Sequence, residues 1–205
     1  MIHAAEQKRP DVVQKREEWK KFLEETDATK LVFLDESGVN IGLTRNYGRS
    51  RGKERVKDSV PFNRPVRTTI VSGIRLNGNC AIQTMDGAMN AERFKEYVEK
   101  ILCPALKPGD IVVMDNLSAH KVQGIRELIE GVGAEVKYLP PYSPEFNPIE
   151  LMWAKMKAYL RAWKIRIKEK LPKAITDALL LGRVHAIDKR SIMSLWKLQK
   201  NNIKR

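Results

Sequence analysis

The stretch "KLVFLDES", residues 30–37, is a short and nearly all-apolar run that ends in acidic residues. Such a run is typical of a strand buried at the centre of a sheet. A second stretch, "DIVVMDN" at residues 110–116, repeats this pattern of an apolar run followed by Asp115. Ligand sites in open α/β sheets collect where strands end. Asp35 and Asp115, which we expect to terminate their strands, are therefore candidate functional residues.

The segments around these two strands predict an α/β fold with a mixed sheet. A hairpin is expected at Asn77-Gly78-Asn79, because Asn-Gly is the strongest short-range hairpin signal. The other expected elements are a leading helix over 11–25, a helix over 90–102 ended by Pro104, a helix over about 119–131 capped by Ser118, a strand over 135–139, and basic helices after residue 150. This order of strands first and alternating helices and strands later is that of an α/β arrangement.

Positive charge is concentrated in two segments of the chain. The whole sequence has a net charge of +13, and residues 151–205 contain 15 Lys and Arg against 3 Asp and Glu. Residues 45–67 contain 8 basic and 2 acidic residues, so the remainder is acidic by about five charges (13 − 12 − 6 = −5). Two basic segments around an acidic remainder favour a polyanion such as nucleic acid as partner. The alternative is a merely solvated basic surface.

Several classes of protein are disfavoured by composition. No apolar run approaches the roughly 18 residues of a transmembrane helix, and the N-terminal residues lack the apolar region of a signal peptide. Cys80 and Cys103 are isolated, so the sequence indicates neither a disulfide framework nor a zinc site. We expect one domain in a reducing cytoplasm, with no membrane partner.

The stretch "YLPPYSPEFNPIE", residues 138–150, supplies a third acidic candidate. Asn147 is a preferred N-cap residue, Pro148 suits the first helical position, and Glu150 would complete a capping box. Glu150 is thus either a helix cap or a carboxylate with a chemical role. Two-metal phosphoryl transfer uses two or three carboxylates around hard cations about 3.5–4 Å apart, and Asp35, Asp115 and Glu150 would provide them.

Four motifs in order, "LVFLDESGV", "TRNYGRSRG", "GDIVVMDNLSAHK" and "LPPYSPEFNPIE", resemble those of mariner-superfamily DDE transposases, most closely the bacterial insertion sequence 630 type. The 34 residues between Asp115 and Glu150 match the spacing of that superfamily. The resemblance implies a ribonuclease-H-like mixed sheet flanked by helices, with Asp35, Asp115 and Glu150 as catalytic metal ligands. It favours the ligand role for Glu150.

The resemblance also implies a function and a domain organisation. Two Mg²⁺ ions, for which Mn²⁺ can substitute, would support cleavage of DNA at transposon ends and transfer of the 3′-hydroxyl into target DNA at TA dinucleotides. The expected partner is double-stranded DNA at the bacterial nucleoid, and a homodimer and a separate helix-turn-helix polypeptide are further partners to consider. We expect a catalytic core over 1–165, led by the helix in 1–29, a basic helical extension over 166–205, and no N-terminal helix-turn-helix module.

Further residues are candidates for contacts with DNA. Glu36 should face away from Asp35, because adjacent side chains of a strand point to opposite faces. Ile149, Met152, Trp153, Met156, Leu160 and Trp163 recur at helical spacing and are predicted to be core. The predicted DNA-binding residues are Arg45, Arg49, Arg51, Lys53, Arg55, Asn116, His120, Lys157 and Arg161. For Asn116 and His120, ordinary hydrogen bonding within a loop or at a helix cap is an equal alternative.

Two other functions are compatible with the same sequence. The first is a catalytically inactive DNA-binding remnant of a transposase that keeps its fold and charge. The second is a ribonuclease-H-like nuclease of repair or RNA processing, which would use the same metals on a related sheet. Cleavage of RNA–DNA hybrids, but not of transposon-end duplexes, would favour the nuclease.

Overall fold

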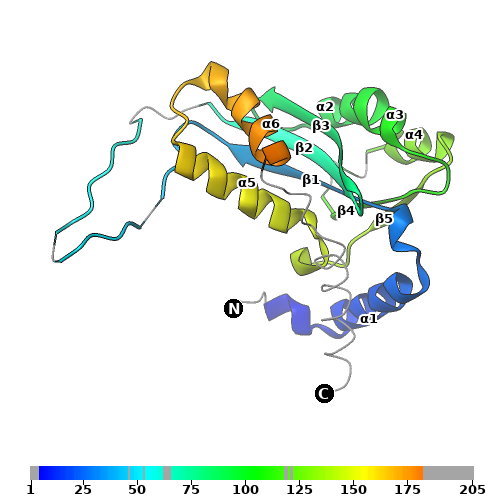
Figure 1. Ribbon diagram of the computed structural model, residues 1–205. Helices are drawn as coiled ribbons and strands as arrows, with labels where there is room; N and C mark the ends of the chain where they lie inside the picture. Colours follow the sequence, from blue (N-terminus) through cyan, green and yellow to red (C-terminus); the bar gives the residue numbers. More distant parts are fainter. Residues whose placement is uncertain are drawn as a thin grey trace.

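A computed structural model describes residues 5–45, 47–52, 54–61, 66–117, 120 and 122–181. Its centre is a five-stranded sheet with the order β3-β2-β1-β4-β5 (Figure 1). The strands are β1 (Leu31–Val39), β2 (Thr68–Arg75), β3 (Gly78–Asp86), β4 (Ile111–Met114) and β5 (Glu135–Tyr138). β1 and β2 and then β2 and β3 pair antiparallel, whereas β1, β4 and β5 run parallel. The mixed sheet confirms the predicted fold class.

The central strand β1 is longer than the sequence indicated. Residues 31–34 are buried, as an apolar central strand requires. The strand continues to Val39 because its antiparallel partner β2 pairs with it as far as Thr68. Asp35 therefore lies inside β1, and the prediction that it terminates the strand is wrong. The parallel pairing of β1 with β4, however, ends at Phe33, two residues before Asp35.

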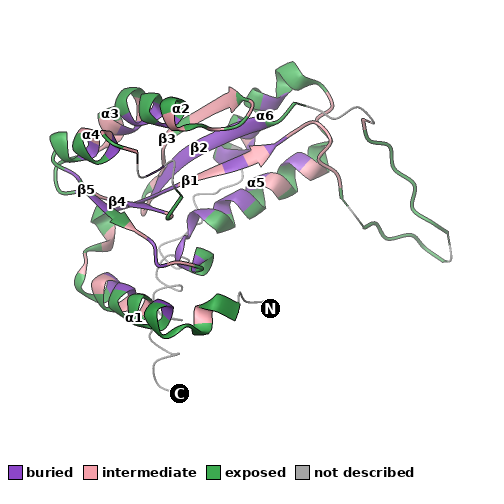
Figure 2. Cartoon of the chain, turned by 180° about the vertical axis from the view of Figure 1, so that it is seen from behind, coloured by how far each residue is buried: buried purple, intermediate pink, exposed green. Residues whose placement is uncertain are grey.

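Helices cover both faces of the sheet. The α-helices are α1 (Pro10–Glu25), α2 (Ala91–Tyr97), α3 (Cys103–Ala105), α4 (Ile125–Gly131), α5 (Ile149–Trp163) and α6 (Leu171–Leu181). Shorter turns are a π-helical turn at Val98–Leu102 and 3-10 turns at Ala5–Lys8, Ala28–Lys30, Pro144–Phe146 and Lys168–Lys170. Helices α1, α5 and α6 share one apolar cluster with the sheet, while α2 and α4 share another on the opposite face. The buried strands lie between these layers (Figure 2).

Alternation along β1 divides its side chains between the two clusters. Phe33 belongs to the cluster beneath α5, and Leu34 belongs to the cluster beneath α2 and α4. By the same alternation Asp35 points to the α5 side and Glu36 to the α2 side. This confirms the prediction that the two adjacent acids face opposite ways.

The hairpin is confirmed, but two predicted helices have different limits. The hairpin turn lies between Arg75 and Gly78. The helix predicted over 90–102 does not end before Pro104, because the helical backbone continues through a π-helical turn at Val98–Leu102 into α3. Pro104 lies at the start of α3, where its missing N–H costs little. Helix α4 begins at Ile125 rather than near 119, since residues 122–124 form a turn with Gly124 at a φ of 94°. Ser118 lies outside the described residues.

Helix α6 is part of the folded core. Leu171, Ala174, Ile175, Ala178 and Leu179 are buried in the same cluster as α5. The part of the predicted 166–205 extension that the structure describes, up to residue 181, therefore packs against α5 and the sheet. Within the described ranges, no helix combines the length and the apolar character needed to cross a membrane.

A long segment between β1 and β2 projects from the body of the molecule. We call the described residues between 40 and 67 (40–45, 47–52, 54–61, 66 and 67) the arm; Figure 1 shows them as extended limbs that leave the sheet near the C-terminal end of α5. The base is held to the body because the Arg166 guanidinium donates to the carbonyls of Ile41 and Leu43, at 2.7 and 3.0 Å. Lys164 also pairs with Asp58 at 2.9 Å.

Candidate active site

The two aspartates lie at the same level on neighbouring parallel strands. Phe33 of β1 is in register with Val113 of β4. Asp35 and Asp115 each follow two residues later, so they lie on the same side of the sheet as Phe33 and Val113. Parallel pairing thus brings together two carboxylates that are far apart in the sequence.

Helix α5 brings Glu150 to the same place. Trp153, one turn further along the helix, is 2% exposed, and its indole N–H donates to Oδ2 of Asp35 at 2.9 Å. Residues three apart lie on one face of a helix, so Glu150 faces the same region as Trp153. The predicted capping box does not form: Asn147 accepts from the backbone N–H of Ile149 at 3.3 Å, and the Glu150 carboxylate is exposed.

The three carboxylates line one cavity of about 390 Å³. Its other walls come from the loop after β4 and from the β5–α5 loop, residues 139–148. Burial raises the pKa of Asp35 to about 6, with smaller contributions from the negative charges of Glu150 and Asp115, although the Trp153 N–H opposes the shift. Ionisation of such a buried carboxyl lowers the free energy of unfolding, unless a positive charge binds next to it.

His120 links the two faces of the site. Its ring is 1% exposed and packs against Phe94 at 4.4 Å between ring centroids. Nε2 lies 3.2 Å from Oε1 of Glu36, and Nδ1 lies 2.7 Å from Oδ1 of Asp115. Burial disfavours the charged ring, but Asp115 and Glu36 outweigh it and raise the pKa of His120 to about 9. The predicted contact between His120 and DNA is therefore wrong for this buried side chain.

Asn116 follows Asp115 and also has a role within the protein. Its side-chain amide donates to the carbonyl of Leu139 at the start of the β5–α5 loop. The residue is exposed and lines the carboxylate cavity. The internal hydrogen bond corresponds to the alternative considered from the sequence, while the proposed DNA contact remains a prediction.

A second hollow adjoins Glu150 and is lined by cationic side chains. Lys157, one turn beyond Trp153, and Arg67, at the base of the arm, line a space of about 470 Å³ together with Glu150 and Glu36. Lys157 therefore lies on the side of α5 that carries Glu150. Arg67 was not among the predicted contact residues, although it belongs to the basic segment 45–67.

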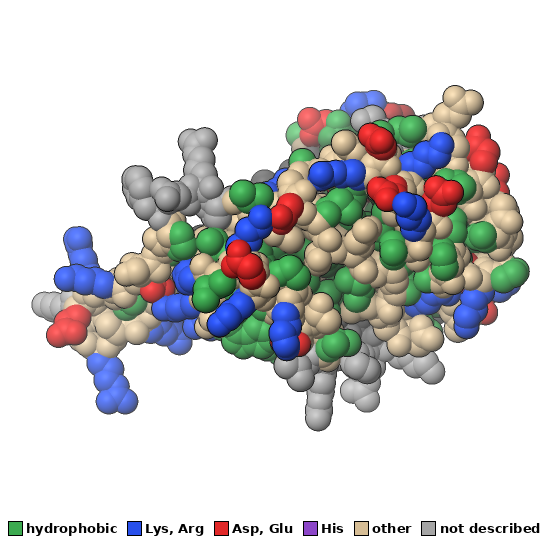
Figure 3. Space-filling view, turned by 90° about the horizontal axis from the view of Figure 1, so that it is seen from above, with side chains coloured by type: hydrophobic (Ala, Val, Ile, Leu, Met, Phe, Trp, Pro, Cys, Tyr) green, Lys and Arg blue, Asp and Glu red, His purple; other side chains and the backbone are tan. Residues whose placement is uncertain are grey.

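The remaining predicted cations gather at the base of the arm or along it. Arg161 of α5 and the arm residues Arg45 and Arg49 line a hollow of about 550 Å³. Arg51 and Arg55 are exposed further along the arm. Figure 3 shows Lys and Arg side chains over the arm and the adjoining end of the body. Lys53 lies outside the described residues.

Two contacts of the site were not anticipated from the sequence. Trp153 was predicted only as a core residue, and the apolar spacing of α5 gave no sign of its hydrogen bond to Asp35. The contact between His120 and Glu36 joins residues 84 positions apart. Sequence periodicity could not identify either pair, because each pair forms only when separate elements pack on the sheet.

Comparisons with known proteins agree with this geometry. A pre-cleavage Mos1 transpososome contains a chain that is 17% identical, with a TM-score of 0.75 over 93% of this chain and 61% of that chain. The Mos1 transposase catalytic domain with Raltegravir and Mg is 15% identical, with a TM-score of 0.67 over 96% of this chain and 94% of that one. These likenesses show the ribonuclease-H-like fold.

The chain spans about three fifths of the length of the Mos1 chain in the transpososome. No curated protein matches its sequence. The sequence model of the family described as DDE superfamily endonuclease matches residues 30–171, which include all three carboxylates, the arm and the whole of α5. The chain therefore belongs to the family of DDE superfamily endonucleases.

Proposed function

We propose that this chain is the catalytic domain of a mariner-superfamily transposase of the bacterial insertion sequence 630 type. It cleaves phosphodiester bonds at transposon ends and joins the freed 3′-hydroxyl to target DNA at TA dinucleotides, in the cytoplasm at the nucleoid. The observation that carries the proposal is the convergence of Asp35, Asp115 and Glu150 on one cavity. Family membership and the fold shared with Mos1 support it.

The carboxylate cavity fits divalent cations by its chemistry. Its acidic oxygens are the hard ligands that Mg²⁺ and Mn²⁺ prefer, and solved Mos1 complexes contain Mg or Mn. Burial is the main cause of the raised pKa of Asp35, with smaller contributions from Glu150 and Asp115, so a cation bound beside it would favour the ionised carboxylate. Across the described ranges no three His, Cys, Asp or Glu side chains are yet close enough to hold one ion, so we expect the carboxylates to approach one another on binding.

Asp35, Asp115 and Glu150 would hold the ions, with Asp115 oriented from behind by His120. Two bound ions supply activation of the attacking hydroxyl and neutralisation of charge at the leaving oxygen. Lys157 and Arg67, beside Glu150, would attract the backbone phosphates of the DNA that enters the site. The arginines of the arm would extend this contact along the duplex.

The test is nicking and strand transfer on a pre-cleaved transposon end with Mg²⁺ or Mn²⁺. We expect the wild-type protein to be active, and Asp115→Ala and Glu150→Ala to lose at least about a hundredfold in rate while still binding DNA, because transition-state charge stabilisation is a large part of such catalysis. Glu127→Ala, an exposed acid on α4, is the matched control and should be fully active.

Other outcomes would assign a different function. DNA binding without any cleavage in either metal would favour the inactive remnant. Cleavage of an RNA–DNA hybrid, with the duplex end left intact, would favour the ribonuclease-H-like nuclease.

A further inference from the structure

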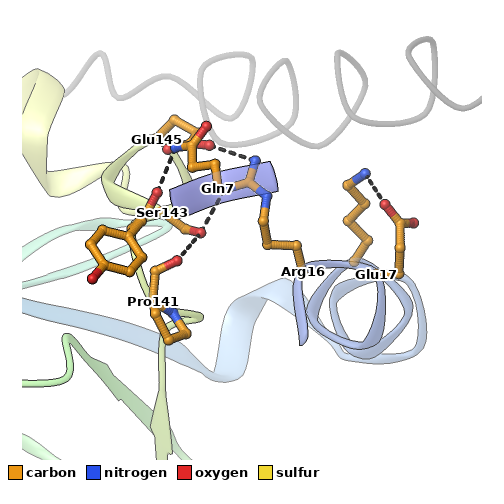
Figure 4. A network of polar contacts seen from close by, with 8 residues as sticks. Gln7, Arg16, Glu17, Pro141, Ser143 and Glu145 are labelled. Carbon is orange, nitrogen blue, oxygen red and sulfur yellow. Dashed lines mark hydrogen bonds and ion pairs between the residues drawn. The ribbon is translucent and has the colours of Figure 1, made fainter. Parts of the chain in front are cut away.

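Helix α1 and the turn before it pack against the β5–α5 loop, although they precede the span that the family model matches, 30–171. Figure 4 shows this contact, in which Gln7 and Arg16 reach the loop from the N-terminal segment. The residues joined by these contacts are 127 to 135 positions apart. The contact is therefore a feature of tertiary structure that neither element implies by itself.

Arg16 is the centre of the contact. One terminal nitrogen donates to Oγ of Ser143 at 2.6 Å, and the other pairs with the carboxylate of Glu145 at 2.6 Å. The guanidinium carbon also lies 4.6 Å from the centroid of the Phe146 ring. Its side chain is only 19% exposed. A planar guanidinium can satisfy several partners at once in a fixed geometry, which a lysine cannot do.

The loop that Arg16 holds is strained next to the cavity. Tyr142 has a φ of 55°, a conformation that bulky side chains rarely adopt. Its carbonyl accepts from the side-chain amide of Gln7 at 2.5 Å. Ser143, which is 4% exposed, in turn donates to the carbonyl of Pro141 at 3.0 Å. Contacts from the N-terminal segment thus help to hold this backbone in place.

Helix α1 is itself firmly attached to the core. Trp19 and Leu23 are buried in the cluster that contains Phe146 and Ile149 at the start of α5. Phe22 packs against the same cluster, and its ring lies 5.2 Å from the Lys137 ammonium of β5. The helix can therefore act as a rigid support for the loop.

We propose that Arg16 is a positioning residue for the active site, and that α1 braces the β5–α5 loop so that Glu150 is presented to Asp35 and Asp115. The loop lines the carboxylate cavity and leads directly into the first turn of α5, where Glu150 lies. The identity of the cavity as a metal site rests on the proposed function. The brace itself rests only on the contacts of Arg16 and Gln7.

The experiment compares Arg16→Met with Lys20→Met in the full chain. Methionine keeps an unbranched apolar stem but removes the guanidinium. Lys20, whose ammonium pairs with Glu17 on the same helix, is the matched control. We expect backbone amides in 142–147 to exchange hydrogen about five- to tenfold faster in Arg16→Met, since hydrogen bonds to a charged group are lost. Mn²⁺ affinity, measured by calorimetry, should fall about fivefold for the same reason.

Two further variants separate positioning from general damage. Glu145→Gln removes the ion pair without altering α1, and should accelerate exchange in the same loop to a smaller extent. Arg16→Lys keeps the charge and should restore part of the Mn²⁺ affinity. If exchange and Mn²⁺ affinity in Arg16→Met equal those of Lys20→Met, the proposal is overturned. If wild-type protein binds no Mn²⁺ and cuts no DNA, the proposed function fails, while amide exchange still decides whether the brace exists.

Discussion

Ionisable side chains at the site are stabilised by partners that come from different elements. His120 lies between two carboxylates, those of Glu36 on β1 and Asp115 after β4. Asp35 accepts a side-chain hydrogen bond from the Trp153 N–H, which lowers its pKa less than burial raises it. The positive charge of the buried His120 is therefore balanced by two carboxylates. The ionisation of the buried Asp35 carboxyl is instead opposed by its surroundings. Asp35 is therefore a residue whose protonation couples the stability of the fold to pH.

We predict that Asp35→Asn stabilises the metal-free protein at neutral pH. The pKa of Asp35 is raised to about 6 in the folded state from 3.8. The folded state thus binds the proton more tightly, and the contribution of Asp35 to the free energy of unfolding falls as pH rises through the interval between about 4 and 6. Asparagine stays neutral and can still accept from Trp153, so the gain at pH 7.5 should be about 1–3 kcal/mol.

Thermal unfolding checks this at pH 4.5 and pH 7.5. The melting temperature of Asp35→Asn should exceed that of the wild type by several degrees at pH 7.5, and this difference should shrink at pH 4.5. Added Mg²⁺ should raise the melting temperature of the wild type more than that of Asp35→Asn. A variant that is less stable than the wild type at pH 7.5 without metal would contradict the account of Asp35.

At the scale of elements, α5 combines roles that its sequence only partly revealed. The helical spacing correctly predicted that Ile149, Met152, Trp153, Met156 and Leu160 are buried. Trp163 is 40% exposed, so its predicted place in the core is wrong; its ring lies tilted against that of Tyr159, 5.7 Å between centroids, near the end of the helix. Periodicity predicts which face turns inward, but it does not say where along the helix the core ends.

Helix α6 provides a prediction about the extent of the folded unit. Leu179 is 2% exposed in the core cluster, and its neighbour Leu180 is 60% exposed. If α6 is part of the core, Leu179→Ala should lower the free energy of unfolding by about 2–5 kcal/mol, because it leaves a cavity. Leu180→Ala should change it by less than about 1 kcal/mol. Urea denaturation measures both, and equal effects would instead indicate a helix that is not packed on the core.

At the scale of the whole molecule, acidic and basic groups are separated by the fold. The carboxylates gather at one cavity, while arginines of the arm and cations of α5 line the hollows around it. The arm projects where it can contact a long polyanion outside the cavity (Figure 1). Such an arrangement would suit a polyanion such as the DNA of the proposed function, held without reading of its sequence, because phosphate contacts carry no base information.

We predict that the arm determines much of the salt dependence of DNA binding. A variant with Arg45, Arg49, Arg51 and Arg55 all changed to Gln should reduce the slope of log K against log salt by up to about 0.9 per lost phosphate contact. The matched control changes Lys8, Lys15, Lys20 and Lys21 to Gln, which lie in or just before α1, away from the arm. Titration by fluorescence anisotropy measures the slopes, and identical slopes for the two variants would exclude the arm as a DNA contact.

Sequence alone determined the local features of this protein. Apolar runs indicated the strands that carry Asp35 and Asp115, and the family motifs identified Glu150 as their partner. Such features are recoverable because strand and helix periodicities are properties of neighbouring residues. The limits of strands and helices were less certain, since β1 is extended by pairing with β2 and α4 is delayed by the turn at Gly124.

Only the tertiary structure decided how the site is held together. The register of β1 on β4 puts Asp35 level with Asp115, Trp153 reaches Asp35 across 118 positions, and Arg16 reaches Ser143 across 127. Burial of His120 likewise turned a predicted DNA contact into an internal support. These contacts depend on which elements pack together, and residues so far apart in the chain meet only when the whole core has formed.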